Sequence, residues 1–256
     1  MRAPARRTSS VTAMLEPRSI AVVGASARPG SFGRQMILTL LQGGYQGAVY
    51  PVNPRYEEIE GLACYSTLAD VPGRPDLALL GVSNAQLEEQ VQAAAAAGAS
   101  AAAIFASGYE EPLPGRPLLT NRVADIARDA RMALCGGNCM GFLNLQESVW
   151  ACGFPMPPQL QAGAITFISH SGSAFSAMLH NDLRLHFNLV VSSGQELVTS
   201  SADYLDYAAN HDSTRVIAMF LETIRAPVEF GRGLKRAAER DIPVVILKVG
   251  RTRMSK

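Results

Sequence analysis

The stretch Ser19-Ile-Ala-Val-Val-Gly-Ala-Ser-Ala-Arg-Pro-Gly-Ser-Phe-Gly33 decides the fold of this chain. Its apolar run at 20–23 predicts a buried parallel strand, and the amphipathic run at 35–41 predicts a helix. The loop between them is rich in glycine and serine, which leaves backbone N–H groups free beside the positive end of the helix dipole. A phosphate or pyrophosphate suits this arrangement. The pattern therefore predicts a nucleotide-like ligand at the edge of a doubly wound parallel sheet.

The spacing of this loop differs from the G-x-G-x-x-G pattern of ordinary dinucleotide-binding folds. A serine follows the first glycine by two residues, and a Pro-Gly turn precedes the last glycine. Glycines can also serve close packing without any ligand, and the loop alone leaves that alternative open. The candidate ligand-binding positions of the loop are Gly24, Ser26, Pro29, Gly30, Ser31 and Gly33.

Length and composition limit the classes of protein to which the chain can belong. Its 256 residues, 48% hydrophobic and 18% charged, suffice for one large or two medium α/β domains. A formal net charge of +1 argues against electrostatic binding of nucleic acid. No apolar run approaches the ~20 residues that span a bilayer, so no membrane association is expected. Residues 1–13 carry arginines and no apolar core, and we expect them to form a disordered tail.

The four cysteines indicate structural thiols rather than a metal site. Cys64, Cys135, Cys139 and Cys152 form no C-x-x-C pair, and the four histidines all lie downstream in a different segment. We therefore expect no bound metal, reduced thiols and a cytoplasmic location.

Strand-like and helix-like segments alternate through the first half of the chain, which favours a parallel, doubly wound sheet. Further strands are predicted at 47–52, 76–82, 101–105 and 132–135, and further helices at 86–97 and 118–130. We expect residues 14–150 to form one Rossmann-like domain. A proline-rich segment without periodicity, residues 151–163, then predicts a linker.

The alternation restarts after the linker and predicts a second, incomplete flavodoxin-like domain at 164–256. Its strands are predicted at 164–168, 187–192, 215–221 and 243–249, with helices at 173–183, 201–209 and 228–240. The open edge of this curtailed sheet favours self-association or a partner subunit.

Four blocks of sequence identify a family resemblance that covers about residues 15–251. The blocks are the glycine loop, Tyr50-Pro-Val-Asn-Pro-Arg55, Gly136-Gly-Asn-Cys-Met-Gly141 and Ile168-Ser-His-Ser-Gly-Ser173. In order and spacing the chain resembles the CoA-binding and first ligase domains of NDP-forming acyl-CoA synthetases. This family includes ADP-forming acetate–CoA ligase and the α subunit of succinyl-CoA synthetase. The resemblance implies that coenzyme A binds at the glycine loop.

The second predicted strand ends in Asn53 and Arg55, with no acidic residue at its tip. An NAD enzyme typically places an Asp or Glu there for the ribose 2′-hydroxyl. A guanidinium prefers phosphate, such as the 3′-phosphate of CoA or the 2′-phosphate of NADP. A solvated turn arginine remains the alternative.

Further ligand positions follow from the resemblance alone. Val82 and Ser83 lie where the family lines the adenine and pantetheine path, and Asn138 lies in the family's Gly-Pro-Asn-Cys turn, with glycine replacing proline. Asn138 can equally serve as a turn former. The turn containing Glu196 is implied to lie near the thioester end of CoA. Cys139 has no evident base nearby, which favours a structural role.

A second anion site is predicted where a strand meets a helix start, at Ser169, Ser171 and Gly172. The resemblance implies that this helix start is one of two that hold the phosphate of a phosphohistidine. His170 stands where the family more often has Gln, so we do not expect it to be phosphorylated. Glu222 matches a family carboxylate that orients the catalytic histidine, and we predict a catalytic role for it.

The resemblance implies one part of an acid–CoA ligase that converts acid, CoA and ATP to acyl-CoA, ADP and phosphate. The family's histidine loop and ATP-grasp domain are not in this sequence, so ATP and Mg²⁺ are expected only with that domain or subunit. The expected ligands are CoA and a small carboxylic acid. Two alternatives stay open: an NADP-dependent oxidoreductase, and a non-catalytic CoA-binding regulatory module.

Overall fold

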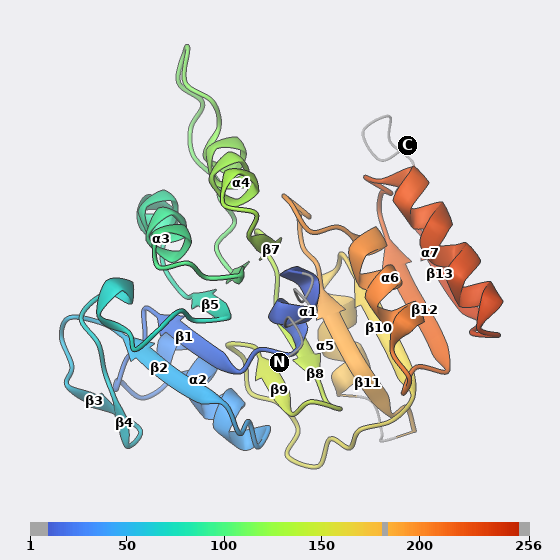
Figure 1. Cartoon of the computed structure of the whole chain (residues 1–256), viewed down its shortest axis with the longest axis horizontal. Helices are drawn as coiled ribbons and strands as arrows, with labels where there is room; N and C mark the ends of the chain where they lie inside the picture. The colour runs from blue at the N-terminus through green and yellow to red at the C-terminus, as the bar shows by residue number, and fades with distance from the viewer. Residues whose placement is uncertain (1–9, 181–183, 251–256) are drawn as a thin grey trace, which may run out of the picture.

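The first predicted strand and helix are both present in the computed structural model, which describes residues 10–180 and 184–250. Strand β1 (Ser19–Val23) runs into the glycine loop, and α2 (Phe32–Gln42) begins directly after it. β1 lies within a five-stranded parallel sheet of order β2-β1-β5-β6-β7 (Figure 1). The other strands are β2 (Ala48–Val52), β5 (Leu77–Leu80), β6 (Ala101–Ile104) and β7 (Ala133–Cys135).

Helices cover both faces of this first sheet because strand side chains alternate between the faces. Ile20 and Val22 pack in one cluster with α2, whereas Ala21 and Val23 pack in another. The second cluster includes buried residues of α3 (Asn84–Ala96) and α4 (Leu119–Asp129). The predicted Rossmann-like arrangement is therefore confirmed.

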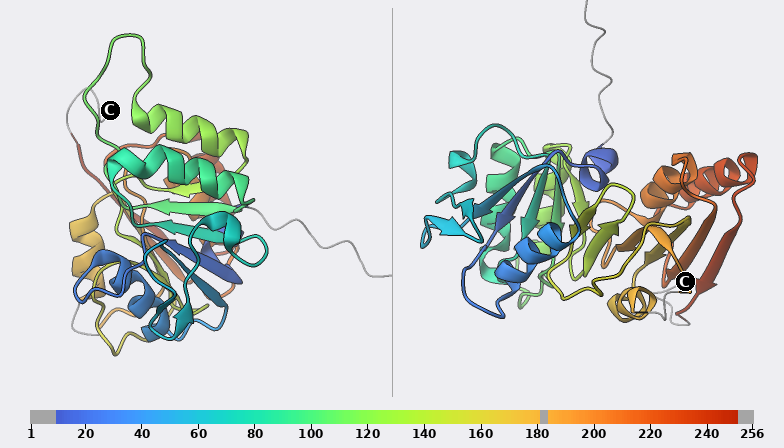
Figure 2. Two further views of the ribbon diagram at one scale, coloured as in Figure 1. Left: turned by 90° about the vertical axis from the view of Figure 1, so that its left-hand side faces the viewer. Right: turned by 90° about the horizontal axis from the view of Figure 1, so that it is seen from below.

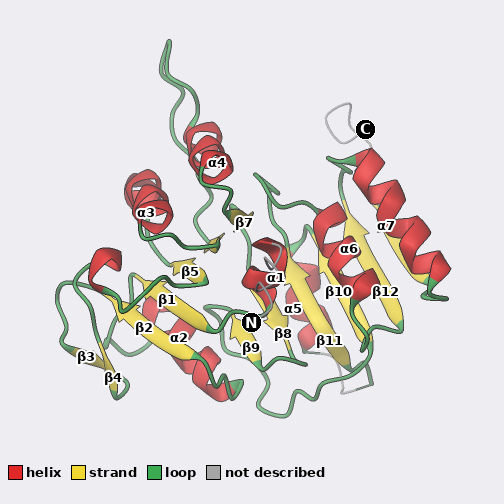
Figure 3. Cartoon of the chain, in the orientation of Figure 1, coloured by secondary structure: helices red, strands yellow, loops and turns green. Residues whose placement is uncertain are grey.

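The second sheet has six strands in the order β13-β12-β10-β11-β8-β9. The first four are parallel, namely β10 (Ile165–Ser169), β11 (Phe187–Ser192), β12 (Val216–Leu221) and β13 (Val244–Lys248). Helix α5 (Gly172–Leu179) covers one face. The other face carries α6 (Ser201–Asn210) and α7 (Pro227–Glu239), as Figures 2 and 3 show. This matches the predicted flavodoxin-like layer.

A hairpin that we assigned to the first domain belongs instead to the second sheet. β8 (Gly141–Asn144) pairs with β9 (Val149–Ala151) and runs antiparallel to β11. The predicted boundary after residue 150 thus separates the hairpin from the sheet that it joins. Every residue of both strands is buried, and pairing satisfies the backbone groups along the edge of β11. Such short strands carry no local signal of which sheet they will extend.

The prediction of a disordered tail at 1–13 is wrong for residues 10–13, while residues 1–9 lie outside the described part. Residues 10–15 form helix α1 (Ser10–Leu15). Met14 and Leu15 are fully buried in the same cluster that holds α2 and α6. Burying these side chains stabilises a helix too short to form in isolation.

The structure adds small elements that periodicity did not predict. They are the hairpin β3 (Glu58–Ile59) and β4 (Leu62–Ala63), and a short 3-10 helix (Leu68–Asp70). In the predicted linker, residues 151–163, Ala151 belongs to β9, and residues 152–163 contain neither helix nor strand. Within the described ranges, no helix has both the length and the apolar character that crossing a membrane requires.

Candidate functional site

A cleft of about 500 Å³ opens at the carboxyl ends of β1, β2 and β5. Parallel strands bring their following loops to one edge, which is where open α/β sheets bind ligands. Five of the predicted ligand-binding residues line this cleft: Gly24, Asn53, Arg55, Val82 and Ser83. The predicted positions Ser26, Pro29, Gly30, Ser31 and Gly33 belong to the adjoining loop and do not line it.

Glycines allow the loop after β1 to approach its neighbours very closely. Gly24 has φ +81°, and a Cβ built on it would lie 2.5 Å from the carbonyl oxygen of Gly81. A Cβ on Gly33 would lie 2.0 Å from the carbonyl oxygen of Gly24. The packing role that the sequence left open is thus present for these two glycines. The same packing brings the start of α2, where a helix leaves N–H groups without partners inside the helix, to the edge of the sheet.

The two serines of the loop hold its shape. Ser31 is the N-cap of α2, and its Oγ accepts a hydrogen bond from the N–H of Arg34 at 3.4 Å. The Oγ of Ser26 accepts from the N–H of Arg28 at 3.1 Å and lies 3.3 Å from the hydroxyl of Tyr56. Both hydroxyls therefore preorganise the backbone that we expect to meet the ligand.

Asn53 connects the loop after β2 to the glycine loop. Its Nδ2 donates to the carbonyl oxygen of Ala25 at 2.7 Å, and its Oδ1 accepts from the N–H of Arg55 at 3.0 Å. The Arg55 side chain is exposed on the wall of the cleft. Within residues 10–180 and 184–250, no carboxylate forms an ion pair with Arg55. A guanidinium without an acidic partner suits an incoming phosphate.

A second group of predicted residues gathers at the carboxyl ends of β10 and β12. Ser171 is the N-cap of α5, and its Oγ accepts from the N–H of Ala174 at 3.3 Å. The Oγ of Ser169 accepts from the N–H of Ser171 at 3.0 Å. Gly172 begins the helix, and a Cβ there would lie 2.8 Å from Cγ of Met140. The predicted strand-to-helix turn is present, with the dipole end of α5 directed at this edge.

Both ring nitrogens of His170 are engaged within the protein. Nε2 lies 2.8 Å from Oε1 of Glu196, and Nδ1 accepts a hydrogen bond from the N–H of Glu222 at 3.0 Å. The imidazole is only 5% exposed. These contacts agree with the expectation that His170 is not the phosphorylated residue.

Glu196 and Glu222 differ in exposure. The side chain of Glu196 is fully buried, and the place of its turn near the thioester of CoA, which the resemblance implied, stays a prediction. Glu222 directly follows β12 and is exposed. Its carbonyl oxygen accepts from Nζ of Lys248 at 2.7 Å. The pairing of Glu196 with His170 was not predicted from the sequence. The two residues are 26 apart along the chain and meet only because β10 and β11 end side by side.

Asn138 lies in the loop between the two sheets. It has φ +53°, and its N–H donates to the carbonyl oxygen of Ala106 at 2.8 Å. The preceding carbonyl, of Gly137, would lie 2.2 Å from a Cβ on Gly194. Asn138 is exposed and does not line the cleft. The turn-forming role is therefore present, and its contact with a ligand stays a prediction.

The cysteines are free and are mostly buried, as the sequence predicts. The sulfurs of Cys135 and Cys139 lie 3.9 Å apart. The hydrogen bond between Cys139 and Cys135, together with burial, raises the pKa of Cys139, and burial raises the pKa of Cys152 to about 12. Thiols held protonated in this way are poor nucleophiles. Among the described residues, no cluster of His, Cys, Asp and Glu is arranged to hold a metal ion.

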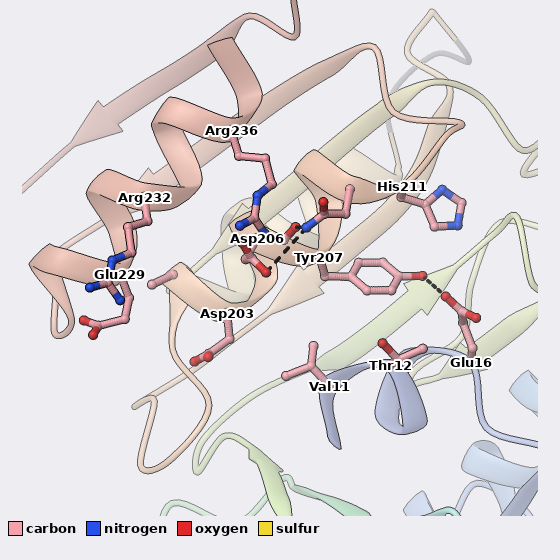
Figure 4. Close-up of a pocket in the computed structure, with 12 residues that line it drawn as sticks. Val11, Thr12, Glu16, Asp203, Asp206, Tyr207, His211, Glu229, Arg232 and Arg236 are labelled. Atoms are coloured by element: carbon pink, nitrogen blue, oxygen red, sulfur yellow. Dashed lines mark hydrogen bonds and ion pairs between the residues drawn. The ribbon is translucent and has the colours of Figure 1, made fainter. Parts of the chain in front are cut away.

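A further cavity of about 580 Å³ lies between α1, α6 and α7 (Figure 4). Some of its polar side chains pair with one another. The hydroxyl of Tyr207 donates to Glu16 at 2.7 Å, and Arg236 pairs with Asp206. None of the predicted site residues lines this cavity.

Two protein-family models match the chain, one in each half. A model described as CoA binding domain matches residues 18–144, and one described as Succinyl-CoA ligase like flavodoxin domain matches residues 162–256. The chain belongs to the family of NDP-forming acyl-CoA synthetases. The resemblance stated from its four sequence blocks is confirmed, and the cleft lies within the part that matches the CoA-binding domain.

Several curated relatives are named as ADP-forming CoA ligases. The chain is 31% identical over 238 residues to acetate–CoA ligase [ADP-forming] I of Archaeoglobus fulgidus, covering 92% of this chain and 34% of that enzyme. It is 28% identical to the α subunit of acetate–CoA ligase [ADP-forming] II of Pyrococcus furiosus, covering 92% and 51%. The chain thus spans about a third of the first enzyme's length and about half of the second protein's.

A solved structure shows the same arrangement of domains. The apo form of the dinucleotide-forming acetyl-coenzyme A synthetase 1 of Ca. Korarchaeum cryptofilum superposes with a TM-score of 0.84 at 30% identity. The superposition covers 96% of this chain and 53% of that one. The two domains found here are therefore an arrangement that this synthetase shares.

Proposed function

We propose that this chain is the CoA-binding part of an ADP-forming acid–CoA ligase. The whole enzyme would convert a small carboxylic acid, CoA and ATP to acyl-CoA, ADP and phosphate through an acyl phosphate and a phosphohistidine. The observation that carries the proposal is the cleft beside the glycine loop, in which Arg55 has no acidic partner among the described residues. The cleft lies in the region that matches a CoA-binding domain.

Each wall of the cleft has a proposed task. Free N–H groups at the start of α2 and in residues 24–33 bind the diphosphate of CoA. Arg55 binds the 3′-phosphate, and Val82 and Ser83 contact the adenine and pantetheine. Asn53 keeps the two loops in register through its bonds to Ala25 and Arg55.

The second group of residues would serve the phosphoryl step. Ser169, Ser171 and Gly172, at the start of α5, hold a phosphate, and Glu222 orients the histidine that becomes phosphorylated. Catalysis of phosphoryl transfer rests largely on positioning and charge stabilisation, which a helix N-terminus can supply.

The chain would work with an ATP-grasp domain or subunit that supplies ATP and Mg²⁺. The α-subunit name of the Pyrococcus furiosus relative supports a partnered arrangement. We expect no acyl-CoA from the chain alone when it is given acid, CoA and ATP. The unpaired cysteines support a reducing, cytoplasmic location.

Calorimetric titration with CoA and dephospho-CoA tests the proposal. We expect CoA to bind at least about tenfold more tightly, because a charge-assisted contact contributes about 1.5–3 kcal/mol. Arg55→Ala should remove this preference, whereas Arg232→Ala, an exposed arginine on α7, should keep it. Equal affinity of the unaltered chain for the two ligands rejects the role of Arg55. No binding of either ligand rejects the proposed function.

A further inference from the structure

Four neighbouring strands of the second sheet end in groups whose hydrogen bonds run in sequence across the sheet edge. Nζ of Lys248, on β13, donates to the carbonyl oxygen of Glu222 at 2.7 Å. The N–H of Glu222, after β12, donates to Nδ1 of His170 at 3.0 Å. His170, after β10, reaches Oε1 of Glu196, after β11, at 2.8 Å. We refer to Lys248, Glu222, His170 and Glu196 as the belt.

The belt is anchored at Glu196. Its Oε1 also accepts from Oγ of Ser193 at 3.0 Å and from the N–H of Ser201 at 2.7 Å. The side chain is fully buried, and the backbone holds φ +52°. Oε2 has no hydrogen-bond partner within the described residues. A carboxylate bound by a loop residue, a helix start and a histidine is a fixed point against which the other strand ends can be held.

The contacts of His170 indicate which tautomer its neutral ring adopts. Nδ1 accepts a hydrogen bond from a backbone N–H, so it carries no proton. Nε2 then carries the ring proton and donates it to Glu196. A second proton can enter only at Nδ1, where it would face the N–H of Glu222. Protonation of His170 therefore breaks the belt between β10 and β12.

We propose that Glu196 is a positioning residue that, through neutral His170, fixes the backbone at Glu222 and the phosphate loop 169–172. In this arrangement, protonation of His170 frees residue 222 and weakens phosphate binding. The inference rests on the proposed function, because it takes the loop 169–172 as a phosphate site. It adds a pH-dependent control of that site by two residues whose side chains are engaged with each other.

Several charged or titratable groups face this pair. Glu222, after β12, contacts His170 through its N–H, and Lys248, on β13, contacts the carbonyl oxygen of Glu222. The thiol of Cys135, on β7, and the hydroxyl of Tyr204, on α6, interact electrostatically with Glu196. Among these described residues, His170 is the only histidine. The belt therefore depends on whether Nδ1 of this ring is protonated.

Substitution by glutamine separates hydrogen bonding from titration. A glutamine carboxamide offers one acceptor and one donor, as neutral imidazole does, but it takes up no proton in the physiological range. His170→Gln should therefore keep the belt throughout that pH range, and His170→Ala should lose it. His180→Gln alters an exposed histidine at the end of α5 and serves as the matched control. Glu196→Gln removes the charge that stabilises a protonated ring.

Nuclear magnetic resonance of the nitrogen-labelled chain reads the belt directly. We expect the neutral His170 ring to carry its proton on Nε2, and the amide of Glu222 to shift when the ring is protonated. That transition should vanish in His170→Gln, remain in His180→Gln and move to lower pH in Glu196→Gln. A ring proton on Nδ1, or a Glu222 amide that ignores the pH in the unaltered chain, overturns the proposal.

Titration with inorganic phosphate reads the consequence. At a pH where His170 is neutral, His170→Gln should bind as the unaltered chain does, and His170→Ala roughly fivefold more weakly. On acidification the unaltered chain should lose more affinity than His170→Gln, a comparison in which the titration of phosphate itself cancels. The proposed role of His170 is overturned if the unaltered chain and His170→Gln show identical pH profiles of phosphate affinity, or if the unaltered chain does not bind phosphate.

Failure of this inference is distinguishable from failure of the proposed function. The CoA cleft lies in the first sheet, and no belt residue lines it. CoA titration of the same samples therefore reports the proposed function separately. We expect CoA affinity to be the same in His170→Gln and His170→Ala.

Discussion

Gly24 allows the glycine loop to lie close to Gly81, the residue that follows β5. Its φ of +81° is the left-handed region, and a Cβ would lie 2.5 Å from a backbone oxygen that cannot move aside. Gly30 also has a positive φ, +73°, but no atom lies within 4 Å of its Cβ position. A side chain at Gly30 would therefore meet backbone strain alone, whereas a side chain at Gly24 would meet both backbone strain and a steric clash.

We predict that Gly24→Ala lowers the free energy of unfolding by about 3 kcal/mol, since overpacking adds to the left-handed strain. Gly30→Ala should cost only about 1 kcal/mol. Urea denaturation of the two variants measures both values. Equal losses would mean that close packing of Gly24 against Gly81 is not what the position requires.

At the scale of elements, Arg122 joins α3, α4 and the loop 105–118. Its guanidinium donates to both carboxylate oxygens of Glu88, at 2.9 and 2.8 Å, and to Glu110 at 2.7 Å. These hydrogen bonds hold the pKa of both carboxyls below the ordinary value of 4.5 and raise the pKa of Arg122. The loop that projects beyond α4 in Figure 1 is thus fixed at its base.

The lowered pKa values predict an acid-sensitive contribution to stability. A carboxyl whose folded pKa is depressed stabilises the fold above its unfolded value, and that contribution is lost as the pH falls through the folded value. Glu88→Gln should therefore lower the urea midpoint near about pH 7, and the difference from the unaltered chain should disappear near about pH 3. Glu111→Gln, at an exposed neighbour of Glu110, should show no such trend. A pH-independent difference at position 88 would contradict the prediction.

At the scale of the whole molecule, the two sheets share one hydrophobic cluster. Residues of β1 and α2 belong to the same cluster as residues of β10, β11 and α6, and α1 contributes Met14 and Leu15 to it. The only tryptophan of the sequence, Trp150 on β9, lies against the C-cap of α2, where a Cβ on Gly43 would be 2.5 Å from Cγ of the indole. The indole thus reports on the junction of the two layers.

We predict that the two layers unfold together. In urea, the fluorescence of Trp150 and the far-ultraviolet circular dichroism should follow one transition, since separating the layers would expose this common core. Two transitions, with the fluorescence changing first, would mean that the junction opens before either sheet is lost.

Sequence reasoning predicted most of the regular elements because their signals are local. The apolar runs of β1, β5 and β10, the turn residues after them and the helix caps each act over a few residues. The glycine loop and the resemblance blocks likewise led to the cleft and the family. Local signals failed for α1, whose two buried residues are covered by distant elements, and for the β8–β9 hairpin, whose sheet is chosen by β11.

The sequence by itself determined the parallel α/β layers, the place of the glycine loop and the membership of the family, because alternation, glycine spacing and motif order can be recognised without three-dimensional contacts. Only the tertiary structure decided that Gly24 and Gly33 pack against backbone, and that His170 lies between Glu196 and Glu222. The physical reason is that parallel strands bring their carboxyl ends to one edge regardless of the 26 residues separating His170 from Glu196 and the 52 separating it from Glu222.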